Sequence, residues 1–133
     1  MNKFTYRLAT SEDYDNVFIE WWNEWGFPVP PKDCLPETGV IVSDRNDDLY
    51  GGFLYLTDGH IGWLEWVVSN KSVSVDRKRG ALEFLVDVVD EMAQNHGMKL
   101  MFTSTVLPAF RNGLLKCGYT RGDEGIYQLV KCL

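Results

Sequence analysis

The segment SVSVDRKRGALEFLVDVV, Ser72 to Val89, contains the most regular apolar pattern of the chain. Its second half places apolar residues at the three- and four-residue spacing of one helical face, namely Leu82, Leu85, Val86, Val89 and, just beyond, Met92. Gly97 follows at a suitable distance to end a helix. The pattern therefore predicts one long amphipathic helix over about residues 77–97.

The charges of this helix are in an unfavourable order. The positive end of the helix dipole carries the three cations Arg77, Lys78 and Arg79. Further along, like charges repeat at four-residue intervals in Glu83, Asp87 and Glu91. An anion held by the free N–H groups of the first helical turn would relieve this conflict, and Gly80 would let it approach the backbone. The alternative is a set of solvated surface cations, each costing at most about 1 kcal/mol.

The segments on either side of the helix alternate between strand and helix patterns. Lys3–Ala9 has the composition of a strand, and the next apolar stripe, from Tyr14 to Trp25, predicts a helix that ends at Gly26. After a Pro-rich loop, three short β-rich segments predict an antiparallel meander over residues 39–44, 49–56 and 61–69. Beyond the long helix we expect a strand at 99–106 and a short helix from Pro108 to Gly118. Two last strand segments follow, separated by residues 122–125.

Composition limits the possible functions. A chain of 133 residues with 45% hydrophobic residues predicts a single domain over 1–133. The net charge of −6 disfavours nucleic acid as a ligand, because phosphate binding needs a basic surface. No apolar run approaches the roughly 20 residues of a membrane span. The N-terminus lacks a signal-peptide pattern, and the three cysteines lack metal or redox spacing, so we expect a soluble cytoplasmic protein with free thiols.

Two motifs resemble the GNAT superfamily of acetyl-coenzyme A-dependent N-acetyltransferases. Arg77-Lys-Arg-Gly80, opening the long helix, resembles the family's pyrophosphate loop, Gln/Arg-x-x-Gly-x-Gly/Ala. Leu114–Tyr119 resembles its Leu-x-x-x-Gly-Phe/Tyr motif. The order of elements is similar over the whole chain, and the short length is most similar to compact acetyltransferase-like proteins of tailed bacteriophages. The resemblance implies an α/β (α+β) fold with a mixed, mainly antiparallel sheet of about six or seven strands and three or four helices.

The resemblance also implies a set of site residues. The pyrophosphate of acetyl-CoA would lie against Arg77, Lys78, Arg79, Gly80, Ala81 and Leu82. Its pantetheine arm would follow the strand before the helix, at Val67, Val68 and Ser69, with Val67 and Val68 as ordinary core residues as the alternative. Glu65 on the same strand is the candidate general base, since apolar neighbours can raise a carboxyl pKa toward neutral pH. An outward-facing Glu65 without a catalytic role is the alternative.

Three positions depart from the family pattern. Leu82 replaces a small residue of the pyrophosphate loop, Leu114 replaces the Tyr that protonates the leaving thiolate, and Leu107 replaces an Asn. Tyr127 is a possible substitute acid. We expect acetyl transfer to an amine of unknown identity, and the acidic surface favours a cationic acceptor. The rival hypothesis is a non-catalytic binding or inhibitory module that acts on a host protein. Oligomeric state is not predicted.

Overall fold

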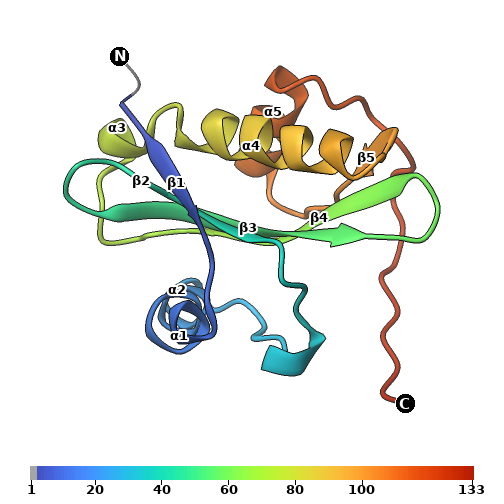
Figure 1. The fold of residues 1–133 in the computed structure, drawn as a ribbon, viewed down its shortest axis with the longest axis horizontal. Helices are drawn as coiled ribbons and strands as arrows, with labels where there is room; N and C mark the ends of the chain where they lie inside the picture. The colour runs from blue at the N-terminus through green and yellow to red at the C-terminus, as the bar shows by residue number, and fades with distance from the viewer. Residues whose placement is uncertain (1–2) are drawn as a thin grey trace.

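A computed structural model describes residues 3–133 and shows a twisted sheet with helices on both faces (Figure 1). The sheet has five strands in sequence order: β1 Thr5–Leu8, β2 Gly39–Ser43, β3 Asp48–Leu56, β4 Ile61–Ser69 and β5 Leu100–Phe102. The first four strands pair antiparallel, and β5 joins β4 in parallel. The predicted mixed, mainly antiparallel sheet is therefore confirmed.

The first helix covers one face of the sheet. It runs from α1 (Ser11–Asp13) through a π-helical segment (Tyr14–Phe18) into α2 (Ile19–Trp25), and Gly26 ends it in a left-handed conformation with φ 73°. A capping box between Thr10 and Asp13 starts it. Its apolar stripe packs on the sheet with the buried residues Phe18, Trp21, Trp22, Ile41, Phe53 and Val68.

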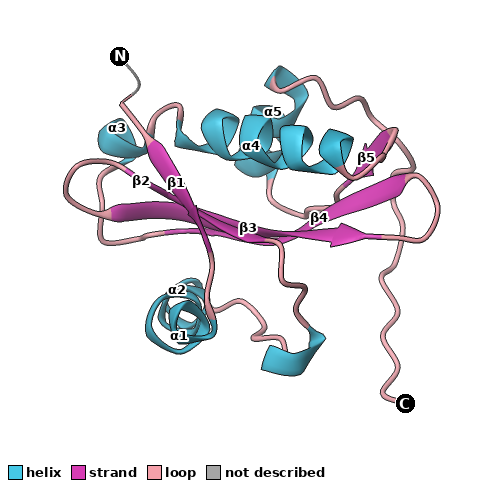
Figure 2. Ribbon diagram, in the orientation of Figure 1, coloured by secondary structure: helices cyan, strands magenta, loops and turns pink. Residues whose placement is uncertain are grey.

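The long helix lies on the opposite face (Figure 2). Here the prediction of one helix over 77–97 is wrong in its first turn: α3 (Val75–Lys78) is a separate turn, and α4 covers Ala81–Asn95. Between them Arg79 is extended and Gly80 has φ 86°, so the helical hydrogen bonding is interrupted. Gly97 ends α4 as predicted, with φ 81°. The buried face of α4 presents Leu82, Leu85, Val86, Val89 and Ala93 to β2, β3, β4 and α5 (Pro108–Lys116).

The C-terminal part of the chain differs most from the prediction. The expected sheet of six or seven strands has five, because residues 119–133 form no strand. The strand expected at 99–106 is limited to Leu100–Phe102. Residues 119–133, here called the C-terminal segment, instead run past β5 and end on the α1–α2 side of the sheet (Figure 1). Strand propensity does not by itself produce pairing, and in the structure this segment does not pair with the outer edge of β5. Within residues 3–133, no helix has the length and apolarity needed to cross a membrane.

The start of the C-terminal segment contains a buried polar atom. Within residues 3–133, the Tyr119 hydroxyl finds no hydrogen-bond partner although it is shielded from solvent. Burial, with smaller contributions from Asp90 and Cys117, raises the pKa of Tyr119 to about 12. A buried hydroxyl without a partner carries a desolvation cost of about 1–3 kcal/mol.

Removing this hydroxyl provides the first prediction. Tyr119→Phe keeps the ring and deletes the unpaired group, so we expect the free energy of unfolding to stay equal or to rise by up to about 1 kcal/mol. The matched control is Tyr55→Phe, because the Tyr55 hydroxyl donates to the Cys34 carbonyl and accepts from Trp66 Nε1. The control should lose about 1 kcal/mol or more. Urea unfolding measures both, and a clear loss of stability in Tyr119→Phe would contradict the assignment.

Candidate functional site

The sheet opens where β4 continues beyond the end of its pairing with β5. β4 and β5 pair only from Ile61 with Leu100 to Trp63 with Phe102. The Thr103 side chain then donates to the Leu64 carbonyl at 2.7 Å, the last contact of this kind along the edge. β4 continues to Ser69, so residues 65–69 border the chain after β5 without strand pairing. The opening includes Val67, Val68 and Ser69, the residues that the resemblance implies for the pantetheine arm.

A β-bulge lies at the opening. On the β3 side, pairing passes from Phe53 with Glu65 to Gly51 with Val68, so that Trp66 and Val67 face the single residue Gly52. Trp66 has φ 60°, a left-handed conformation that an aromatic residue rarely adopts. Glycine avoids a close contact here, because a side-chain carbon added to Gly52 would lie 2.9 Å from Val67 Cγ2.

Three hydrogen bonds from aromatic side chains hold this part of β4. Trp22 Nε1 donates to the Trp66 carbonyl at 3.2 Å, and Trp66 Nε1 donates to the Tyr55 hydroxyl at 2.9 Å. Trp25 Nε1 donates to the Ser69 carbonyl at 2.8 Å. Helix α2 is therefore attached to β4 at two points along the opening.

Glu65 faces the α1–α2 side of the sheet. Its cross-strand partner Phe53 belongs to the aromatic core on that side, and directly paired residues share a face. The Glu65 side chain is neither buried nor fully exposed, and burial raises the pKa of its carboxyl. It lines a hollow of about 1700 Å³ together with Tyr55, Trp66, Val67 and residues of β5, α5 and the C-terminal segment. A half-buried carboxyl beside an open cavity can accept a proton from a bound ligand.

The three residues expected to hold pantetheine have different surroundings. Val67 is partly buried against the α4 side of the core and lines the hollow. Val68 is 2% exposed and belongs to the aromatic core on the other side, so its side chain is structural. Ser69 lies at the end of β4, where its carbonyl is engaged by Trp25 and its hydroxyl lies 3.3 Å from Lys78 Nζ.

The N-terminus of α4 presents backbone donors. The first helical bond runs from the Phe84 N–H to the Gly80 carbonyl at 3.0 Å, so the N–H groups of Ala81, Leu82 and Glu83 precede the helical ladder. Within residues 3–133, no side chain caps this end. Such a helix end attracts an anion through both its N–H groups and its dipole. Residues 77–82 do not line the hollow that contains Glu65.

The three cations already have partners within the chain. Arg77 Nη2 lies 2.8 Å from Asp44 and 2.9 Å from Asp47, both in the turn between β2 and β3. Lys78 Nζ donates to the Asn70 carbonyl at 2.9 Å, and burial lowers its pKa. Arg79 pairs with Asp76 at an exposed position. The charge conflict seen in the sequence is thus reduced by Asp44, Asp47 and Asp76 without any ligand.

Asp44 has a strongly lowered pKa. The N–H of Asn46 donates to its carboxylate, and with the Asp47 N–H and Arg77 it lowers the pKa of Asp44 to about 2. The Asp44 side chain is 10% exposed. The pair of Arg77 and Asp44 therefore connects the β2–β3 turn to α3 as a structural contact.

The positions that depart from the family pattern lie in the core or on the surface. Leu114 is 3% exposed and packs in the α4 core, so this position carries a packing residue where the family has a hydroxyl. Leu107 precedes α5 and is 44% exposed. Tyr127, the possible substitute acid, is 91% exposed in the C-terminal segment.

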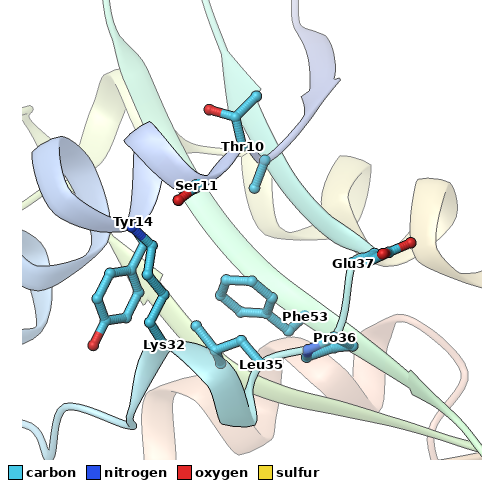
Figure 3. A pocket seen from close by; sticks show the side chains of 9 residues that line it. Thr10, Ser11, Tyr14, Lys32, Leu35, Pro36, Glu37 and Phe53 are labelled. Carbon is cyan, nitrogen blue, oxygen red and sulfur yellow. The ribbon is translucent and has the colours of Figure 1, made fainter.

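A second, smaller hollow lies on the α1–α2 side (Figure 3). It measures about 270 Å³ and is lined by Ala9, Thr10, Ser11, Tyr14, Lys32, Leu35, Pro36, Glu37 and Phe53. Two of its polar groups already have partners: Tyr14 donates to the Pro30 carbonyl at 2.7 Å, and Lys32 pairs with Asp15 at 2.9 Å. Within residues 3–133, no cluster of His, Cys, Asp and Glu could hold a metal ion.

Sequence reasoning missed the bulge and the acidic partners of Arg77. The adjacent Gly51 and Gly52 in an otherwise apolar strand were the available signal for a close backbone approach at the bulge. The acids of Asp44-Arg-Asn-Asp47 offered a signal for a turn that could hold a cation, but nothing in the spacing indicated which one.

Comparison with known proteins places the fold. No family model matches the chain, and no curated protein is similar in sequence. Among solved structures, an aminoglycoside acetyltransferase from an uncultured soil metagenomic sample, in complex with sisomicin, has a TM-score of 0.73 at 10% identity, covering 99% of this chain and 98% of that one. Glucosamine-6-phosphate N-acetyltransferase from Arabidopsis thaliana has a TM-score of 0.68 at 10% identity, with coverage of 98% and 100%.

A third similar structure was solved with coenzyme A. The aminoglycoside N-acetyltransferase AAC(6')-Iy in complex with CoA has a TM-score of 0.67 at 15% identity, with coverage of 97% and 95%. A transcriptional regulator from Bacillus halodurans has the same TM-score, 0.67, at 17% identity, covering 96% and 99%. Identities this low establish a common fold and leave the activity open. The chain has the GNAT fold of the acetyltransferases among these structures.

Proposed function

We propose that this protein is an acetyl-CoA-dependent N-acetyltransferase that acts on an amine. The observation that carries the proposal is the unpaired edge of β4 over residues 65–69, which has a half-buried carboxyl at one end and the uncapped N-terminus of α4 beyond the other. Similar structures in this fold are acetyltransferases, and AAC(6')-Iy was solved with CoA. The acidic chain, with a net charge of −6, favours a cationic acceptor.

The backbone of this chain would hold the co-substrate. The N–H groups of Ala81, Leu82 and Glu83 would bind the pyrophosphate, with Gly80 giving it access. Arg77 and Arg79 would contribute less than the backbone, since their side chains already pair with Asp44, Asp47 and Asp76. The edge of β4 around Val67, which lies beyond the pairing with β5, would take the amide groups of pantetheine, as a neighbouring strand would. Acetyl-CoA supplies a thioester whose acetyl group can pass to nitrogen.

Glu65 would act on the amine. An amine with a pKa near 10.4 is mostly protonated at neutral pH and must lose a proton to attack. Glu65 can accept that proton directly or through water, and burial raises the pKa of the carboxyl toward the working range. The new N–C bond replaces the C–S bond, and the electrons of that bond leave with sulfur. With Leu114 in place of a Tyr, sulfur would leave as a thiolate, which a thiol pKa near 8.5 allows.

The cofactor site can be tested at the two ends of α4. Gly80→Ala adds a methyl group where the phosphate would approach, and we expect CoA to bind about 10–100-fold more weakly through lost charge-assisted bonds. Gly97→Ala is the matched control, because its φ of 81° is close to the 86° of Gly80 and its added carbon meets nothing within 4 Å. Both changes should cost about 1–2 kcal/mol for a left-handed residue. Gly80→Ala should cost somewhat more, because its added carbon also lies 3.3 Å from Phe4 Cε2.

Isothermal titration with CoA at low and high salt measures the difference. Binding by the wild type should weaken as salt screens the pyrophosphate contact. Equal CoA affinity in Gly80→Ala and Gly97→Ala would contradict the placement of the pyrophosphate. The absence of any heat or thermal stabilisation of the wild type at millimolar CoA would remove the proposed function.

The role of Glu65 gives the next prediction. Glu65→Gln keeps the shape but cannot accept a proton, so we expect acetyl transfer to fall about 10²–10⁴-fold while CoA affinity is unchanged. The wild-type rate should rise with pH through the raised pKa of Glu65, and the variant should lose that rise. A carboxyl whose pKa is raised on folding destabilises the protein above that pKa, so Glu65→Gln should be at least as stable as the wild type at pH 8.

Thiol release from acetyl-CoA, measured with an amine panel of spermidine, sisomicin, glucosamine 6-phosphate and a lysine peptide, provides the rate. Glu37→Gln is the control, since this exposed carboxyl lines the smaller hollow instead. An unchanged pH–rate profile in Glu65→Gln would exclude the general-base role. CoA binding without turnover on a panel extended to other amines would favour a non-catalytic binding module.

A further inference from the structure

The larger hollow reaches both faces of the sheet. Asp90 and Gln94 of α4 line it on one face, and Phe27, in the loop after α2, lines it on the other. Its volume of about 1700 Å³ exceeds the roughly 300–1,000 Å³ of a single small-molecule site, so it has room for a second ligand beside acetyl-CoA. The helix end proposed to bind the pyrophosphate belongs to α4, so the second ligand would lie on the α1–α2 side.

Aromatic side chains that are not fully buried line the hollow on this side. They are here called the aromatic wall: Phe27, Tyr55, Trp63, Trp66 and Phe102. Trp63 lies two residues before Glu65 on β4 and pairs with Tyr55 of β3, so these three side chains share a face. The Phe102 ring stacks on the Trp63 ring, with 5.0 Å between the ring centroids. The remaining two members pack against the aromatic core of the same face.

The aromatic wall is accessible, and part of it is held in place by hydrogen bonds. Trp63 is 38% exposed and Phe102 is 42% exposed, and adjacent exposed rings that border a hollow are typical of a binding surface. Trp66 Nε1 donates to the Tyr55 hydroxyl at 2.9 Å, and that hydroxyl donates to the Cys34 carbonyl at 3.0 Å. Rings fixed in this way can contact a flat ligand with little further loss of side-chain freedom.

Glu65 is the carboxylate beside the aromatic wall. Among residues 3–133, no Lys, Arg or His forms a salt bridge with it. The other acids of the hollow lie elsewhere, because Asp90 is on α4 and Asp123 is in the exposed C-terminal segment. Glu124, also in that segment, pairs with Arg121 at 2.9 Å. One unpaired carboxylate next to several rings matches a ligand with one positive charge and an apolar body.

From this arrangement we propose that the acceptor is an arylalkylamine, whose ring lies against the aromatic wall and whose ammonium group pairs with Glu65. This inference rests on the proposed acetyl transfer and names its substrate class. Tyr55 and Glu65 are diagonal neighbours on adjacent strands, and such positions lie roughly 7–8 Å apart. A short chain of two or three carbons between the ring and the nitrogen matches this separation.

The same arrangement defines the transfer. The ammonium gives one proton to Glu65, which leaves a neutral amine beside the thioester. The nitrogen lone pair forms the N–C bond to the acetyl group, and the C–S bond breaks with its electrons on sulfur. One of the two remaining nitrogen protons passes through water to the thiolate. The products are an N-acetyl arylalkylamine, the free thiol of coenzyme A and protonated Glu65, which then loses its proton to solvent.

Binding measurements test the acceptor class without turnover. Isothermal titration at pH 7, with and without CoA, compares phenethylamine with n-butylamine, 2-cyclohexylethylamine and spermidine. Phenethylamine should bind about 10–100-fold more tightly than n-butylamine, because its ring adds buried apolar area. It should bind about 2–10-fold more tightly than 2-cyclohexylethylamine, because aromatic pairs are favourable beyond the area that they bury. Spermidine, with several charges and no ring, should bind more weakly than phenethylamine.

Variants of the full chain locate the ring. Trp63→Leu removes one member of the wall, so phenethylamine should bind about 2–10-fold more weakly while n-butylamine changes by less than about 2-fold. Tyr6→Leu is the matched control, because Tyr6 is 52% exposed on β1, at the other edge of the sheet and outside the hollow. Glu65→Gln should weaken binding of each amine about 10-fold or more and leave the preference for a ring unchanged. Circular dichroism verifies folding, and Phe102→Leu replaces Trp63→Leu if that variant does not fold.

The outcomes separate the acceptor class from the acetyl transfer itself. Equal affinity for phenethylamine and n-butylamine, or for phenethylamine and 2-cyclohexylethylamine, would overturn the aromatic acceptor, as would tighter binding of spermidine. An equal loss for phenethylamine and n-butylamine in Trp63→Leu would also overturn it. In each of these cases CoA binding and turnover of another amine would still support acetyl transfer. A ring preference that depends on Trp63, in a protein that does not bind CoA, would support the aromatic site and remove the acetyl transfer.

Discussion

The left-handed backbone of Trp66 is the constraint on which the site depends. An aromatic residue in this conformation costs about 1–2 kcal/mol and persists only when its surroundings fix it. Here the fixing contacts are the bond from Trp22 to the Trp66 carbonyl and the bond from Trp66 Nε1 to Tyr55. The bulge interrupts the alternation of β4, so Glu65 and Trp66 both belong to the α1–α2 side while Val67 packs toward α4. In a regular strand, successive side chains point to opposite faces, so Glu65 and Trp66 would not both lie on the α1–α2 side.

The aromatic stripe of the first helix supports that backbone as well as filling the core. Trp21 and Trp22 are buried, as amphipathic spacing predicts, whereas Trp25 is 39% exposed and binds the Ser69 carbonyl through Nε1. Two indoles of one helix therefore fix two carbonyls of β4, on either side of Val67 and Val68. Indole N–H groups that pack against a sheet need acceptors, and the Trp66 and Ser69 carbonyls of β4 supply them. The contacts that pack the first helix on the sheet therefore also fix the geometry of the candidate site.

Much of the fold follows from periodicity and from glycine positions. The strands of the meander, the helix ended by Gly26 and the stop at Gly97 agree with the sequence because each depends on local patterns. The break at Gly80, the bulge and the unpaired C-terminal segment do not, because each depends on a partner distant in the chain. Arg77 shows this most clearly: its charge suggests a ligand, while its location gives it Asp44 and Asp47, about thirty residues away. The sequence proposed Glu65 and Val67 as site residues; both line the larger hollow, and the roles assigned to them stay predictions. For Val68 the sequence left a core position open as the alternative, and the structure places this side chain in the aromatic core.

The substitution at Leu82 illustrates how the fold accommodates a departure from the family pattern. A leucine in the first turn of α4 would obstruct a phosphate only if its side chain turned toward the N–H groups. Instead Leu82 is 8% exposed and packs against α5, where a side-chain carbon added at Gly113 would lie 2.8 Å from Leu82 Cδ2. The absence of a side chain at Gly113 thus makes room for the bulk of Leu82. The Leu82 side chain therefore belongs to the contact between α4 and α5 and adds to the core on that face of the sheet.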